Sequence, residues 1–179
     1  MTRISLSPAT RGTYQKTISI PAEEFGKPKT NPPEVVDQGD VTLYAFTVNT
    51  DKMTYKFPIP SDYAGGDMKF LVIWTNDGGV DDNGKAAKWQ LDYQVSGEGD
   101  SVDGDHGNSP KNVEDTYTSA SGWIEHHTAD MTIGSPDFSG KLCILLKLSA
   151  ITPTGAALTC EPHLLGICYT YTAIWGRKP

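Results

Sequence analysis

The sequence has no long hydrophobic run. Each apolar stretch is interrupted by polar residues before it reaches the ~18 positions that a membrane-spanning helix requires. The opening residues, Met1 to Pro8, also lack the apolar core of a secretion signal. We therefore expect neither a membrane span nor export, and no membrane partner.

Cysteine and positive charge are also scarce. The three cysteines, Cys143, Cys160 and Cys168, are an odd number, which argues against a disulfide framework. We expect reduced thiols, with a Cys160–Cys168 disulfide as the alternative. Fifteen Lys and Arg against 22 Asp and Glu give a net charge of −7. Because such a charge repels nucleic acid, no nucleic-acid partner is expected.

The motifs of the common nucleophilic and phosphate-binding enzymes are absent. The sequence contains no Gly-x-Ser-x-Gly, no His-Glu-x-x-His and no glycine-rich phosphate loop. We predict that the protein is not an enzyme and that it binds no cofactor. A carboxylate pair such as Glu125 with Asp130 or Asp92 is the catalytic alternative, although most acidic β proteins offer such pairs.

Candidate metal ligands do not form a recognisable site. His126 and His127 are neighbours on an expected strand, so their side chains point to opposite faces. The loop from Asp100 to Asn108 resembles a calcium loop but lacks the terminal bidentate Glu, which leaves a solvated acidic loop or a Ca²⁺ site as alternatives. A second acidic loop is interpreted as ordinary solvated turns, and its carboxylates are Asp77, Asp81 and Asp82. No metal site is predicted.

Glycine, proline and tyrosine are plentiful, and alternating apolar residues predict β-strands. The expected strands are 41–48, 53–59, 68–74, 87–95, 123–133, 142–148 and 164–175, with a weaker one at 116–120. In strands 68–74 and 142–148 the residues of both faces are apolar, which is typical of strands covered on both faces. Helix is expected only as short turns near 61–65 and 135–138. This pattern predicts an all-β antiparallel two-sheet sandwich of the jelly-roll type, with an immunoglobulin-like sandwich as the alternative.

The N-terminal segment, residues 1–33, differs from the remainder, residues 34–179, in charge. Its five cations against Glu23 and Glu24 give +3, which leaves −10 for the remaining residues. Prolines in 28–33 favour an extended path. We expect either an edge strand added to the same sandwich or an extended arm that docks on a neighbouring protein. The candidate docking residues are Arg3, Arg11, Lys16, Lys27 and Lys29.

Tryptophans are the natural platform for a saccharide, and the sequence has Trp74, Trp89, Trp123 and Trp175. However, Trp89 and Trp123 fall among the apolar positions of their alternating strands, which predicts that both belong to the core.

A series of short motifs supports a more specific hypothesis. Their order is Phe57 to Asp67 (FPIPSDYAGGD), Ile73-Trp74, Trp89 to Tyr93 (WQLDY), Glu114 to Tyr117 (EDTY), Gly140 to Leu146 (GKLCILL) and Leu164 to Tyr171 (LLGICYTY). This order resembles the jelly-roll capsid decoration, or cement, proteins of tailed bacteriophages over residues 41–175. The resemblance implies a trimer that binds the major capsid protein on the outer face of the capsid shell.

The expected function is therefore that of a non-enzymatic structural protein, located on the capsid exterior of the virion and synthesised in the host cytoplasm. An arm could add contacts to a neighbouring sheet edge, while the acidic body faces solvent. The alternatives are a carbohydrate-binding or host-recognition module of a phage fibre, or another head or tail component.

Overall fold

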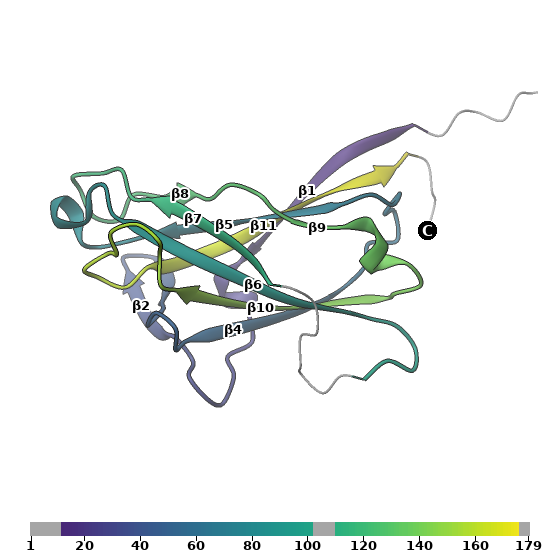
Figure 1. The fold of residues 1–179 in the computed structure, drawn as a ribbon, viewed down its shortest axis with the longest axis horizontal. Coiled ribbons are helices and arrows are strands. Elements are labelled where there is room, and N and C mark those ends of the chain that lie inside the picture. The colour runs from purple at the N-terminus through teal and green to yellow at the C-terminus, as the bar shows by residue number, and fades with distance from the viewer. Residues whose placement is uncertain (1–11, 102–109, 176–179) are drawn as a thin grey trace, which may run out of the picture.

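The computed structural model describes residues 12–101 and 110–175, which form two antiparallel β-sheets packed face to face (Figure 1). Sheet A contains β1 (Thr13–Pro21), β2 (Glu34–Gln38), β3 (Val41–Ala45), β5 (Met68–Thr75), β8 (His126–His127), β9 (Met131–Ile133) and β11 (His163–Ile174). Sheet B contains β4 (Lys52–Pro58), β6 (Ala86–Ser96), β7 (Lys111–Thr116) and β10 (Cys143–Ile151). The expected all-β sandwich is confirmed.

The strand order is that of a jelly roll. β3 pairs with β11, β4 with β10, β5 with β9, and β6 with β7, as in a long antiparallel ribbon folded back on itself. The pairs β5–β11 and β6–β10 then join these ribbons side by side within the two sheets. Two sheets of order 3-11-5-9 and 4-10-6-7 result, which is the double Greek key of this architecture.

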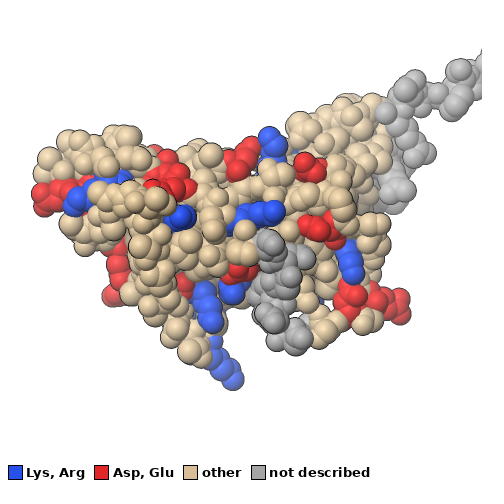
Figure 2. Space-filling model, viewed as in Figure 1, with Lys and Arg blue, Asp and Glu red and all other residues tan. Residues whose placement is uncertain are grey.

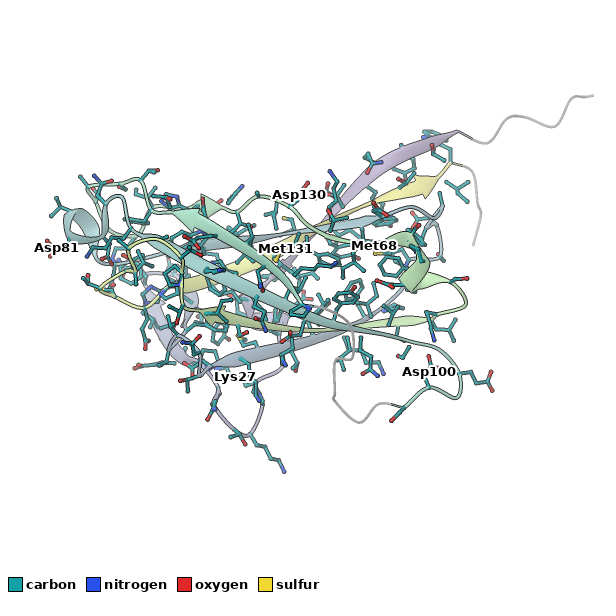
Figure 3. The ribbon with its side chains drawn as sticks, in the orientation of Figure 1. Lys27, Met68, Asp81, Asp100, Asp130 and Met131 are labelled. Carbon is teal, nitrogen blue, oxygen red and sulfur yellow. The ribbon has the colours of Figure 1, made fainter. Side chains whose placement is uncertain are left out.

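The core lies between the sheets and follows the alternation of the strands. Trp74 and Trp89 are fully buried there, and Met68 and Met131 are packed at the other end (Figure 3). The expectation that β5 and β10 are covered on both faces is wrong for most of their length, because Leu71 of β5 and alternate residues of β10 are only half-buried.

The described part of the N-terminal segment is integrated into the sandwich. All nine residues of β1 pair with β11, so the edge-strand alternative describes residues 13–21. After a 3₁₀ turn at Ala22–Glu24, Phe25 enters the core, where its ring lies 5.2 Å from that of Tyr55. Gly26 then exchanges backbone hydrogen bonds with Thr54 at the edge of β4. This segment therefore links sheet A to sheet B along one open side.

Smaller expectations are met in part. The 3₁₀ helix Ser135–Phe138 confirms one expected helical turn, while residues 61–65 form turns and Gly79–Asp82 adds an unexpected 3₁₀ helix. The strand expected at 123–133 is two short strands, β8 and β9.

Cys143, Cys160 and Cys168 are free, in agreement with the expected reduced thiols. Within residues 12–101 and 110–175, no helix is long and apolar enough to span a membrane.

Candidate binding surfaces

Lys16, a candidate docking residue, is held within the body. Its Nζ donates to Asp62 Oδ2 at 2.8 Å, and Tyr171 Oη donates to Asp62 Oδ1 at 2.7 Å. The hydrogen bond from Lys16 is the main cause of the lowered pKa of Asp62, and the same bond raises the pKa of Lys16. This network ties the tip of the β1–β11 ribbon to the loop before β5.

The other candidate cations lie elsewhere. Lys27 Nζ is 4.6 Å from the centre of the Tyr44 ring, a cation–π contact. Lys29 is exposed. Figure 3 shows Lys27 on the sheet B side of the sandwich, far from the tip of β1. Arg3 and Arg11 lie outside the described residues. The structure therefore does not bring Lys16 and Lys27 into one patch.

The outer face of sheet A mixes hydroxyl with apolar groups. Thr17 and Thr170 share a hydrogen bond of 2.8 Å between their hydroxyls, and Gln15 donates to the hydroxyl of Thr172 at 2.9 Å. Half-buried Leu71 lies on the neighbouring strand of the same face. A face that mixes apolar and hydrogen-bonding groups has the composition of a protein–protein contact surface.

Buried polar side chains cross-link the loops at the opposite end of the sandwich. Asp82 is fully buried, and its Oδ1 accepts hydrogen bonds from the backbone and hydroxyl of Thr159 at 2.7 and 2.6 Å. Its Oδ2 accepts from Cys160 N at 3.2 Å, and Lys85 Nζ lies 3.2 Å from Oδ1. Burial alone would raise the pKa of Asp82, but these donors together lower it. The loops after β5 and β10 are thus fixed to each other.

Asp82 corrects the expectation that Asp77, Asp81 and Asp82, the carboxylates of the loop after β5, are all solvated. Asp81, at the tip of the same loop, is exposed (Figure 3), whereas the adjacent Asp82 has no exposed surface. No sequence signal separates the two, because the partners of Asp82 come from a loop 77 residues away.

Asn76 and Tyr117 extend this network to the loop before β8. Asn76 is fully buried, and its carbonyl accepts hydrogen bonds from Tyr117 Oη at 3.2 Å and from Trp123 N at 2.7 Å. Trp123 has a φ of 66°, a left-handed conformation that is strained for a bulky side chain. The hydrogen bond to Asn76 therefore helps to hold Trp123 in this conformation.

Trp123 lies outside the sandwich core, so the prediction that it belongs to the core is wrong. It is half-buried and lines a pocket of about 150 Å³ on the outer face of sheet A, together with residues of β2, β3 and β11. Its ring lies 5.2 Å from the ring of His163. Of the other tryptophans, Trp74 and Trp89 are fully buried, as predicted for Trp89, and Trp175 is 70% exposed at the tip of β11.

His163 forms part of the floor beneath Trp123. It is 4% exposed, and its Nδ1 is buried without a hydrogen-bond partner among the described residues. Burial lowers the pKa of His163, although Asp77, Glu161 and Glu34 act in the opposite direction. The imidazole is therefore stable in its neutral form.

His126 and His127 point to opposite sides of β8, which confirms the expectation that they do not converge. His126 contacts the rings of Trp74 and Tyr117, at 5.2 and 4.7 Å, while His127 Nε2 lies 2.6 Å from Glu125 Oε1. The described part of the chain contains no cluster of three or more His, Cys, Asp or Glu that could hold a metal.

The Asp100–Asn108 loop falls mostly outside the described residues. Asp100 itself accepts hydrogen bonds from Gly97 N at 2.7 Å and from Lys141 Nζ at 2.6 Å, which lower its pKa. Figure 2 shows acidic and basic side chains interspersed on one face of the molecule, without a single large field of either sign.

The comparisons with known proteins concern the fold. The sequence matches no protein-family model and no curated protein. An exo-β-1,3-galactanase from Phanerochaete chrysosporium, solved with galactose, matches 92% of this chain with a TM-score of 0.51 at 11% identity. Structures of infectious bursal disease virus, among them the Gx strain, cover the whole chain with TM-scores of 0.45 or lower at 10–12% identity. The chain spans 30–39% of the length of these proteins, and the galactanase match supports a β-sandwich fold alone.

Proposed function

We propose that this chain is a non-enzymatic decoration protein of a virus particle, which binds the outer surface of the major capsid shell as a homotrimer. The observation that carries the proposal is the position of the N-terminal segment. β1 is fixed along β11 over nine residues, and Trp175 N donates to the carbonyl of Gly12 at the projecting end of this ribbon (Figure 1). Eleven further residues, including Arg3 and Arg11, precede Gly12.

This arrangement separates anchoring from folding. Residues 13–26 belong to the sandwich, so a cationic extension before Gly12 can contact a neighbour without disturbing the fold. Residues 1–11 alone can span up to about 35–40 Å when extended. The proposed contact acts within that distance of the tip.

A decoration protein stabilises a shell by binding the assembled lattice and not the free subunits. Each bound copy then shifts the assembly equilibrium by its binding free energy. In a trimer, three weak contacts act together, because the second and third bind at a high effective concentration. The part of the outer face of sheet A beside the β1–β11 ribbon, with Thr170 and half-buried Leu71, offers a second contact surface.

The test is co-sedimentation with capsid shells that lack the protein, using a variant truncated before Gly12 and the variant Arg11→Glu. Lys56→Glu, on the exposed outer side of β4, is the matched charge control. We expect the truncation to reduce occupancy at least about tenfold (1.4 kcal/mol) and Arg11→Glu to weaken binding in a salt-dependent manner. Full occupancy by both variants would overturn the role of the N-terminal segment.

A deletion of residues 1–33 would not serve this test. It would remove β1 and the buried Phe25 together with the candidate cations. Loss of binding would then report an altered sandwich and not a lost contact.

A further inference from the structure

A rigid aromatic surface lies next to hydrogen-bonding groups on the outer face of sheet A. Trp123 is fixed from behind by the His163 ring and along its backbone by the hydrogen bond from its N–H to the carbonyl of buried Asn76. A ring held in this way loses little conformational entropy when a ligand packs on it. The left-handed φ of Trp123 is a further sign that the loop is held in place by its surroundings.

The walls of this Trp123 pocket are apolar on one side and polar on the other. Val41, Leu43 and Leu165 supply the apolar wall, and Gln38 and Glu125 supply an amide and a carboxylate. The volume of about 150 Å³ is half or less of a typical drug-sized site, so the pocket suits one small ring. Sugar hydroxyls both donate and accept, and the Gln38 amide can satisfy both roles.

The charge of the surroundings narrows the ligand class. Glu125 lines the pocket, and Glu34, Asp77 and Glu161 act electrostatically on His163 beneath it. An anionic ligand such as a nucleotide or an acidic sugar would be repelled by these carboxylates. The Gln38 amide supplies donors as well as acceptors, and a neutral ring with several hydroxyls uses both kinds of group.

We infer that the Trp123 pocket binds a neutral hexopyranose unit of a glycan, with the apolar face of the sugar on the indole and its hydroxyls toward Gln38 and Glu125. This activity goes beyond capsid binding and does not depend on it. A decoration protein with such a site would add weak, repeated contacts between the particle and a glycan-bearing surface.

The test uses the full chain and named sugars. Saturation-transfer NMR with galactose, glucose, mannose and N-acetylglucosamine identifies the bound monosaccharide. A glycan array then measures binding of the protein to densely displayed glycans that carry this sugar. We expect Trp123→Ala to weaken binding about tenfold or more. Trp175→Ala, which removes the exposed tryptophan at the tip of β11, should leave binding unchanged.

The variant Gln38→Ala tests the same pocket without altering the loop that carries Trp123. Gln38 is an exposed residue at the end of β2, so its truncation should preserve the fold and still weaken binding several-fold. The inference is overturned if none of the four sugars binds, if adenosine binds in their place, or if Trp175→Ala alone abolishes the signal. Particle binding by Trp123→Ala should be normal, which separates this result from the capsid test.

Discussion

The buried carboxylate of Asp82 lies on the loop after β5 and accepts hydrogen bonds from the loop after β10, so it holds the two loops together. Replacing Asp82 by Ala removes a fully buried carboxylate and leaves Thr159 N, Cys160 N and Lys85 Nζ without their partner. We expect the free energy of unfolding to fall by about 3 kcal/mol. Urea denaturation measures this loss.

Asp81→Ala is the matched control, because Asp81 is exposed on the same turn. Its effect should stay within about 0.5 kcal/mol. Equal effects of the two substitutions would contradict the assigned role of Asp82.

The buried histidines predict a pH dependence of stability. Burial lowers the pKa of both His163 and His126 below the ordinary 6.5. Below pH 6.5 the unfolded chain therefore binds protons that the folded chain refuses, so stability falls with falling pH until the folded-state pKa is reached. Thermal unfolding between pH 7.5 and 5 should show a falling melting temperature.

His163→Leu should flatten this pH dependence, since it removes one of the two titrating groups. An unchanged pH profile in His163→Leu would show that the buried imidazole is not responsible.

At the scale of elements, the strands follow from the sequence more closely than the connections do. The sequence pattern located β4, β5, β6, β10 and β11 to within about three residues: alternation marked β4 and β6, and continuous apolar runs marked β5 and β10. The same reasoning was wrong for Trp123, because a loop can place an aromatic ring against the outside of a sheet. The partners of Asp82 and the pairing of β1 with β11 depend on contacts between distant residues, which periodicity does not encode.

The link between the sheets formed by β1 and Phe25 can be tested by truncating the core side chain. Phe25 is 4% exposed and packs against Tyr55. Phe25→Ala should lower the free energy of unfolding by about 3–4 kcal/mol. Tyr14→Ala, at the exposed end of the same segment, should cost less than about 1 kcal/mol; a near-zero cost for Phe25→Ala would mean that the segment is not integrated.

Gly166 permits the close approach of β1 to β11. A Cβ at this position would lie 2.6 Å from the carbonyl oxygen of Ile20, which belongs to the backbone and cannot rotate away. Gly166→Ala should therefore destabilise the protein by about 1–3 kcal/mol and increase hydrogen exchange along β1.

Gly12→Ala, where a Cβ meets nothing within 4 Å, is the control for the glycine substitution. It should leave exchange along β1 unchanged. Fast exchange in both variants would point to general fraying of the ribbon and not to the contact at Gly166.

For the molecule as a whole, the jelly roll combines two independent surfaces on one rigid body. The ribbon of β1 and β11 projects at one end, and the cross-linked loops with the Trp123 pocket lie at the other (Figure 1). A particle-bound protein with this arrangement can anchor at the first end and present the second to solvent. The acidic net charge of −7 would help to keep decorated particles apart.

Electron cryo-microscopy of the proposed capsid shells, imaged with and without the purified chain, tests the central claim most directly. The account predicts added density of jelly-roll size on the outside of the shell, repeated with the capsid lattice, with the β1–β11 tip toward the major capsid protein. Particles that show no added density on the shell, or density only at the tail, would contradict it.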